Sequence, residues 1–242
     1  CYTKAASQPS HAGKLSITLS GGATVWYEIV EGPYVNVACF GMVGDGATPN
    51  DAAFIDVQQY AFRASYLYSN VKIVFPRGDF LFTGANPWGK WVTSAVARGH
   101  VVFEGAGRYA TTIRYQPVGA GPHYLYNGEN GTSGVGSSNQ WVGALFRGML
   151  FLVDGANMTG VQKATLFRQF PAAGTPAQNF QFYDCYFTAT SATVAGSVIE
   201  TRGSINASEN AFYNCTARQF LHILDLNNPQ AVNHYAIGCN WE

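Results

Sequence analysis

The sequence predicts an all-β solenoid, a fold in which short strands wind into a stack of coils. A phrase with a sulfur-containing residue at a fixed place recurs along the 242 residues. Short apolar segments, rich in β-branched and aromatic residues as strands are, lie between its copies. The composition, with 27 Gly and 12% charged residues, is that of a globular, β-rich chain. A chain of this length can bury a large core, and one elongated domain accounts for it.

Each copy of the recurring phrase consists of a short strand, a turn residue and then a sulfur-containing side chain. The sulfur slot holds Met149 in the first copy and Cys185, Cys215 and Cys239 in the next three, at intervals of 36, 30 and 24 residues. Such drift does not fit helical repeats of fixed period, but it fits a β-solenoid whose turns vary in length. About six coils spaced by ~4.8 Å would make a rod of about 25–30 Å.

The cysteines are interpreted as core residues. At equivalent positions of successive coils they would stack as an inward ladder of small apolar thiols. Their total of five is odd and their spacing matches no zinc pattern, so neither a disulfide framework nor a zinc site is expected. This interpretation implies synthesis in a reducing compartment, although disulfides between adjacent coils are an alternative.

The strands predicted for the solenoid lie between and before the copies of the phrase. They cover residues 71–82, 101–107, 111–115, 197–200 and 220–225. Residues 119–140, rich in Gly, Ser and Asn, are expected to leave the solenoid as a long loop.

Residues 105–110 also match the Gly-x-Gly-x-x-Ala fingerprint of dinucleotide-binding proteins. The fingerprint requires a helix next, whereas residues 111–115 are β-branched and aromatic and are followed closely by Pro117. A tight turn between two strands is therefore the better interpretation.

A separate small module is predicted before the solenoid. Two β-rich segments, residues 15–20 and 23–29, flank Gly21-Gly22, which is a strong signal for a two-residue hairpin. Residues 1–37 are accordingly assigned to an N-terminal neck.

A sharp turn and a helix are predicted next. Gly41, Gly44 and Gly46 supply backbone angles that other residues resist. Apolar residues then recur at helical spacing, so a helix is expected near 51–68. The acidic residues of this stretch, Asp45, Asp51 and Asp56, are interpreted as structural rather than catalytic.

Two segments resemble the opening motif of the pectate-lyase-like right-handed β-helix proteins. They are residues 40–54 and, about twenty residues later, Val-Phe-Pro-Arg-Gly at 74–78. In that motif a Phe-Gly-x-x-Gly-Asp-Gly turn feeds a capping helix and then a strand ending at Phe-Pro-x-Gly. The resemblance covers roughly residues 35–85 and departs at Pro49-Asn50, where the family usually has two acidic residues. It implies a right-handed parallel β-helix at 38–242 with an N-terminal capping α-helix.

The superfamily includes bacteriophage tailspikes, capsule depolymerases and secreted polysaccharide lyases, hydrolases and epimerases. Resemblance to a tailspike implies a homotrimeric virion component, assembled in the host cytoplasm, that recognises and depolymerises a bacterial capsular or lipopolysaccharide glycan. Its N-terminal region would contact other phage tail proteins. The alternatives are a secreted polysaccharide lyase or glycoside hydrolase, and a non-enzymatic virion adhesin or structural protein. Because the sequence ends within a copy of the phrase, which would leave an unpaired strand edge, either a fragment of a longer spike or a partner chain that covers this edge is expected.

Charge and hydropathy argue against other classes of partner. The net charge is zero, the pI is about 7.1 and no basic run is present, which disfavours nucleic acid. No apolar stretch approaches the ~20 residues of a spanning helix, so membrane insertion is not expected. Neither a carboxylate cluster nor paired His at ligand spacing is seen, so no metal or other cofactor is expected.

Few residues of the repeating region suit polysaccharide cleavage. Hydrolysis usually needs two carboxyl groups ~5–10 Å apart, and coil stacking could place Glu200 and Asp225 on one face. A lyase would instead need a base beside a cation, roles that His222 and Arg202 could fill. The alternative for all four is an ordinary solvated residue at a strand end or turn.

Five aromatic residues are candidates for sugar contact. Flat apolar faces with polar edges pack well against sugar rings, and these five are expected in or beside loops. They are Trp88, Trp91, Tyr124, Tyr126 and Trp141.

Overall fold

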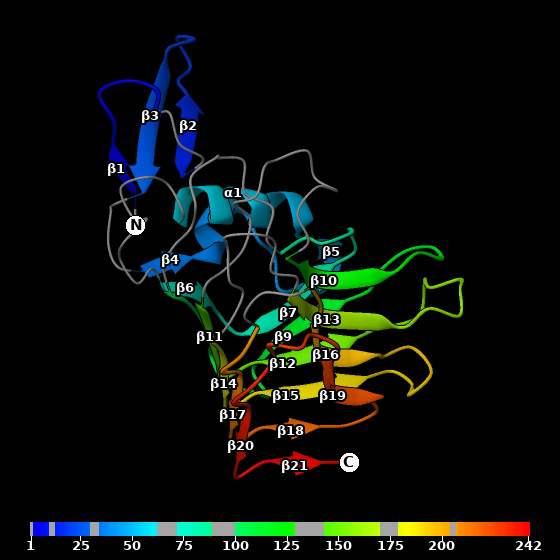
Figure 1. Ribbon diagram of the computed structural model, residues 1–242. Coiled ribbons are helices and arrows are strands. Elements are labelled where there is room, and N and C mark those ends of the chain that lie inside the picture. Colours follow the sequence, from blue (N-terminus) through cyan, green and yellow to red (C-terminus); the bar gives the residue numbers. More distant parts are fainter. Residues whose placement is uncertain are drawn as a thin grey trace.

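The structure is a right-handed parallel β-helix, as the sequence predicts, with a helix at one end and a small antiparallel sheet beyond it (Figure 1). The computed structural model describes residues 2–9, 13–29, 34–61, 72–88, 100–128, 143–169, 179–203 and 207–242. Within these ranges, no helix has the length and apolar character needed to cross a membrane.

Three parallel sheets form the sides of the solenoid. The first contains β4 (Tyr34–Asn36), β6 (Lys72–Phe75), β8 (His100–Gly105), β11 (Gly143–Arg147), β14 (Phe180–Tyr183), β17 (Ala211–Tyr213) and β20 (Tyr235–Ile237). The second contains β5 (Asp45–Pro49), β7 (Gly78–Phe82), β9 (Thr111–Tyr115), β12 (Leu150–Val153), β15 (Tyr186–Ala189), β18 (Thr216–Ala217) and β21 (Asn240–Trp241). The third contains β10 (His123–Asn127), β13 (Ala164–Gln169), β16 (Ser197–Thr201) and β19 (His222–Leu226).

Two details differ from the prediction, and a third agrees with it. The solenoid already begins at β4, which pairs with β6, slightly before the boundary expected at residue 37. Strand β10 belongs to the third sheet, although the loop expected at 119–140 included it. Residues 111–115 form β9 rather than a helix, so the glycine-rich segment before them is the turn that was expected.

A column of phenylalanine rings runs through the interior along the first sheet. Phe103, Phe146, Phe182 and Phe212 are Cα partners on successive strands. Their rings lie 5.1, 4.7 and 5.0 Å apart between centroids, at interplanar angles of 8°, 10° and 11°. All four are buried, and they pack against a shorter column from the second sheet. The core is therefore a set of stacked rings rather than an irregular cluster.

The corner between the first and second sheets has the same backbone conformation in four successive coils. Its turn residues, Gly148, Asp184, Asn214 and Gly238, have φ values of 61°, 50°, 55° and 65°. Gly, Asn and Asp are the residues that tolerate this left-handed region best. The turn slot of the recurring phrase is thus a conformational requirement.

The sulfur slot follows directly and faces the interior. Cys185 and Cys215 are buried and Cys239 is partly buried. Their thiols donate to carbonyl oxygens of the preceding coil, those of Phe146, Phe182 and Phe212, at 3.6, 3.4 and 3.4 Å. Burial raises the pKa of the Cys185 thiol. The predicted thiol ladder is confirmed, and the four cysteines that the structure describes are free.

Helix α1 (Asp51–Ala61) lies across the end of the solenoid that carries β4 and β5 (Figure 1). A short 3-10 helix, η1 (Val37–Phe40), precedes it. Phe54 packs its ring 4.8 Å from that of Trp88, and Asp51 accepts hydrogen bonds from the amides of Thr83 and Gly84 at 3.1 and 2.8 Å. The helix therefore covers the open end of the core. The rest of the helix expected to residue 68 lies outside the described residues.

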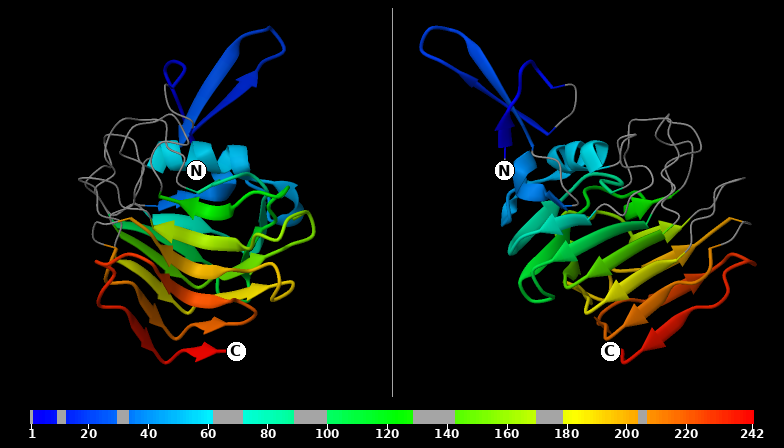
Figure 2. Two further views of the ribbon diagram at one scale, coloured as in Figure 1. Left: turned by 45° about the vertical axis from the view of Figure 1, so that its right-hand side comes forward. Right: turned by 90° about the vertical axis from the view of Figure 1, so that its left-hand side faces the viewer.

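The N-terminal module is a three-stranded antiparallel sheet that projects away from the solenoid (Figure 2). It contains β1 (Tyr2–Lys4), β2 (Lys14–Thr18) and β3 (Thr24–Ile29), in the order β1-β3-β2. The β2–β3 hairpin confirms the Gly21-Gly22 signal, whereas β1 was not predicted.

The turn before α1 predicts a distinct pH dependence of stability. Asp45 accepts hydrogen bonds from the amides of Thr48 and Ala47 at 2.8 and 2.9 Å, and these bonds lower its pKa to about 2. A carboxyl group whose folded-state pKa is depressed stabilises the fold above its unfolded pKa, near 4, and loses that contribution as the pH falls towards 2. The stability difference between the native protein and Asp45→Ala should therefore shrink between pH 5 and pH 2 in urea unfolding.

Asp56 on α1 is the matched control, because burial raises its pKa. Asp56→Asn should stabilise the protein at neutral pH and lose that advantage on acidification, which is the opposite trend. Parallel pH trends for the two variants would contradict the assignment.

Candidate functional site

A charged cluster lies on the outside of the third sheet, near the ends of three successive strands. Arg168, Glu200 and Asp225 are Cα partners on β13, β16 and β19. Each directly follows a residue of the Phe167, Ile199 and Leu224 row, which packs towards the interior. Because successive side chains of a strand point to opposite faces, the charged row points outward.

Glu200 is the centre of the cluster and is only 8% exposed. Its Oε1 lies 2.9 Å from Nε of Arg202 and 3.4 Å from Nε of Arg168. The Thr165 hydroxyl donates to its other oxygen at 3.3 Å. Nη2 of Arg202 also contacts Oδ2 of Asp225 at 3.0 Å. One guanidinium group therefore joins carboxylates of two adjacent coils.

This arrangement brings together three of the four predicted catalytic residues: Glu200, Arg202 and Asp225. Two carboxylates held by one guanidinium group fall within the ~5–10 Å over which carboxyl pairs of glycosidases act. Two guanidinium groups stabilise negative charge on Glu200, which suits a base, a nucleophile or an electrostatic stabiliser. Asp225 has the more exposed side chain, 33% against 10% for Glu200, and is the more accessible of the two to a ligand.

His222 does not join this cluster. It is the first residue of β19 and the Cα partner of Ser197, and it lies three residues before Asp225. In the part of the chain that the structure describes, no ion pair or hydrogen bond joins the predicted base of a lyase, His222, to the predicted cation, Arg202.

Two of the predicted sugar-contacting aromatics lie in the core instead. Trp88 is fully buried against Phe54, Phe75 and Phe103, with ring centroids 4.8, 5.8 and 5.1 Å away. Tyr126 is fully buried on β10. Both expectations of a loop position were wrong, because these segments pair with strands from distant parts of the chain. Trp91 and Trp141 lie outside the described residues.

Tyr124 does extend the charged cluster. It is partly exposed on β10, and the guanidinium carbon of Arg168 lies 4.9 Å from the centroid of its ring. This is the geometry of a cation–π contact. Arg168, Glu200 and Asp225 thus form a row over three strands of the third sheet, and Tyr124, whose Cα partner is Thr165, contacts this row through Arg168.

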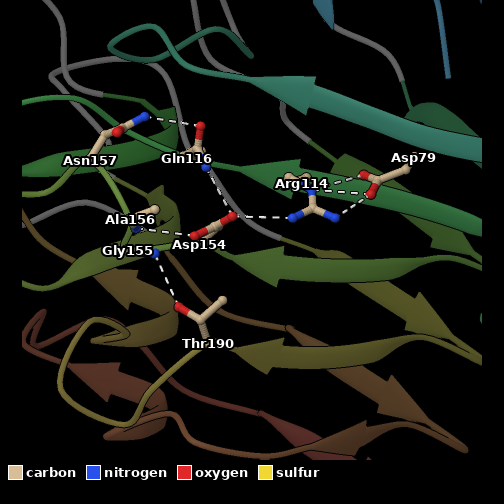
Figure 3. A network of polar contacts seen from close by, with 8 residues as sticks. All are labelled: Asp79, Arg114, Gln116, Asp154, Gly155, Ala156, Asn157 and Thr190. Carbon is tan, nitrogen blue, oxygen red and sulfur yellow. Dashed lines mark hydrogen bonds and ion pairs between the residues drawn. The ribbon is translucent and has the colours of Figure 1, made fainter. Parts of the chain in front are cut away.

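A second polar network, which was not predicted, crosses three coils on the outside of the second sheet (Figure 3). Arg114 on β9 donates to Asp79 on β7 through Nη2 and through Nε, the latter at 3.1 Å. Its Nη1 donates to Asp154, which follows β12, at 3.1 Å. Its hydrogen bond with Asp79 raises the pKa of the Arg114 guanidinium. Gln116 also donates to Asp154, at 3.0 Å.

This network ties the coils together rather than presenting free groups. Asp154 also accepts from the amide of Ala156 in its own turn, and Asn157 donates to Gln116 (Figure 3). Asp79 and Arg114 lie in strands outside the recurring phrase. Their signal in the sequence is a charged residue within each of two otherwise apolar strands.

The described part of the chain brings no three His, Cys, Asp or Glu side chains together in a way that could hold a metal ion.

No protein-family model matches the chain, and no curated protein matches it in sequence. Three solved structures are similar to parts of it. The A-module of the mannuronan C-5 epimerase AlgE4 of Azotobacter vinelandii is 17% identical, over 85% of this chain and 58% of that one, with a TM-score of 0.47. Pantoea stewartii WceF, a glycan biofilm modifying enzyme with a bacteriophage tailspike-like parallel β-helix fold, is 14% identical, over 99% and 39%, with a TM-score of 0.48.

The catalytic unit of a thermostable α-1,3-glucanase from Streptomyces thermodiastaticus is 12% identical, over 90% of this chain and 50% of that one, with a TM-score of 0.27. The chain thus spans 39% to 58% of the length of these structures. Likenesses at such TM-scores carry no conclusion about this chain. The stacked sheets place this chain among the parallel β-helix proteins.

The cluster predicts unequal costs for removing its two carboxylates. Glu200→Gln leaves Arg168 and Arg202 without their shared, nearly buried anion and should destabilise the protein by roughly 3 kcal/mol. Asp225→Asn removes a contact at a more exposed position and should cost at most about 1 kcal/mol. Urea unfolding at neutral pH measures both changes, and equal losses would show that Glu200 is not the centre of the cluster.

Proposed function

We propose that this chain is the β-helix of a bacteriophage tailspike that binds and depolymerises a bacterial capsular or lipopolysaccharide glycan. The observation that carries the proposal is the pair of carboxylates, Glu200 and Asp225, joined by Arg202 on the outside of adjacent coils. The resemblance of residues 40–54 and 74–78 to the opening motif of the pectate-lyase-like proteins supports the wider class.

The row on the third sheet suits a polymeric ligand. Arg168, Glu200 and Asp225 follow one another from strand to strand at the ~4.8 Å spacing of paired strands, and the ring of Tyr124 lies beside Arg168. A tyrosine ring can pack against a sugar face, and the charged groups can bond sugar hydroxyl groups. A row of evenly spaced contacts fits successive units of a chain better than it fits a compact small molecule.

Hydrolysis would divide the work between the two carboxyl groups. Asp225, the more exposed one, would donate a proton to the glycosidic oxygen as the bond to the anomeric carbon breaks. Glu200, whose negative charge Arg168 and Arg202 stabilise, would support the positive charge that develops on the sugar. It would also take the proton of the attacking water or attack the anomeric carbon itself.

A specific observation favours a second candidate, a non-enzymatic virion adhesin. Both carboxylates are engaged by guanidinium groups, and an acid catalyst works best when its proton is readily held and released. In an adhesin the same row would bind the glycan without cleaving it. A secreted polysaccharide lyase or hydrolase is the remaining alternative.

The catalytic assignment predicts that the purified chain releases new reducing ends from a capsular or lipopolysaccharide glycan. Glu200→Gln and Asp225→Asn should each lower that rate by about 100-fold or more, because general acid–base groups contribute about that much. Asp56→Asn, on the exposed side of α1, is the control and should keep the native rate. Unsaturated uronate absorbance would point to a lyase, and binding without cleavage would establish the adhesin.

The tailspike assignment also predicts a homotrimer. Three apolar side chains on β2 and just after it are exposed: Leu15 and Ile17 to 46% each and Leu19 to 50%. In a trimer, neighbouring copies of the chain would cover this apolar row. Sedimentation equilibrium should then give three times the 26.1 kDa of one chain, and Leu15→Asn/Ile17→Asn should lower the mass to that of a monomer. A native monomer would favour the secreted enzyme.

A further inference from the structure

A second surface of the solenoid combines aromatic rings with arginines, away from the third sheet. It lies at the corner between the first and second sheets, where backbone hydrogen bonds link successive turns. Gly107 donates to the carbonyl of Gly148, Gly148 to that of Tyr183, and Asp184 to that of Tyr213, at 2.9, 3.0 and 3.0 Å. Side chains next to these positions are therefore neighbours in space.

Four tyrosines line this corner. The rings of Tyr183 and Tyr213 stack with centroids 4.6 Å apart at an angle of 12°. Tyr109 meets Tyr186 edge to face with centroids 6.1 Å apart, and Tyr109 is 75% exposed. A tyrosine so exposed contributes little to the core, and its ring is available to a ligand.

Two arginines lie over these rings. The guanidinium carbon of Arg108 is 5.2 Å from the ring centroid of Tyr109, and that of Arg147 is 5.7 Å from the centroid of Tyr183. Arg108 also donates to the carbonyl of Asn214 at 3.3 Å. In the part of the chain that the structure describes, neither arginine forms an ion pair.

The neighbouring charges leave an excess of cations. Arg218, near Tyr186, is paired with Glu242 at 2.6 Å and is neutralised. Asp184 is the exposed acid of the corner, and the side chain of Asn214 donates to it at 2.5 Å. Glu104, the Cα partner of Arg147, is paired with Lys72 at 2.5 Å. The carboxylate of Asp184 therefore remains to balance the two guanidinium groups of Arg108 and Arg147.

We propose that this corner patch, formed by Arg108, Tyr109, Arg147, Tyr183, Tyr186 and Tyr213, binds a carboxylate-bearing polysaccharide. The aromatic rings would pack against sugar faces, and the guanidinium groups would bond the carboxylates of uronic acid units. The inference rests on the proposed function and narrows its substrate class to an acidic glycan. The chain has no net charge and the patch has only two such cations, whereas binding of nucleic acid needs many clustered ones.

The test measures binding to a panel of purified acidic capsular polysaccharides, each compared with a form whose carboxyl groups are reduced to alcohols. The native chain should bind an acidic member at least tenfold more tightly than its reduced form. Arg108→Gln/Arg147→Gln should remove that preference and the salt dependence that accompanies it, and Tyr109→Ala should weaken both forms. Lys163→Gln, at the corner between the second and third sheets, is the matched control and should bind like the native chain.

The outcomes separate the inference from the proposed function. Native binding that the patch variants leave unchanged overturns the inference while the proposed function stands. Failure to bind any polysaccharide of the panel overturns both. Equal or tighter binding of a single-stranded DNA oligonucleotide at the same patch would assign it to nucleic acid instead. Thermal unfolding of each variant, expected to match the native chain because the replaced side chains lie at the surface, shows that the fold is intact.

Discussion

The stacking of equivalent side chains at the strand spacing is the constraint on which the rest of the molecule depends. Parallel pairing holds each coil in register with the next, and Phe146 and Phe182 are consequently stacked at 4.7 Å and almost parallel. A shift of one residue in any coil would turn its rings outward and bring polar side chains into the core. The interior therefore also determines the position of every residue on the outside.

The candidate site is a direct result of this constraint. Ile199 contributes to the core, so its neighbour Glu200 must face outward, directly between Arg168 of one coil and Asp225 of the next. No special loop is needed to bring these charges together. The register that places Phe167 and Ile199 in the core also places the charged groups of Arg168 and Glu200 side by side.

The same logic explains which features were accessible from the sequence. The thiol ladder was predictable from equivalent places in neighbouring copies of the phrase, and the Glu200–Asp225 pair from the apolar segments that lie between those copies. Trp88 and Tyr126 were misplaced because glycine and proline nearby indicate loops, whereas their burial comes from pairing between distant segments. Arg114 was missed because its two partners lie 35 and 40 residues away, and neither its own strand β9 nor the strand β7 of Asp79 contains a copy of the phrase. Local patterns identify coils, but contacts between dissimilar coils require the actual register.

The uniform corner has a consequence for how such a molecule can change in length. Gly148, Asp184, Asn214 and Gly238 adopt one backbone conformation, although the distances between them along the chain differ. Variation in the size of a coil is thus absorbed on the other sides of the solenoid. If a whole coil were inserted or removed between two such corners, the coils brought together would still have matching corner geometry. Evolution can extend or shorten the structure one turn of chain at a time, without repacking the turns that remain.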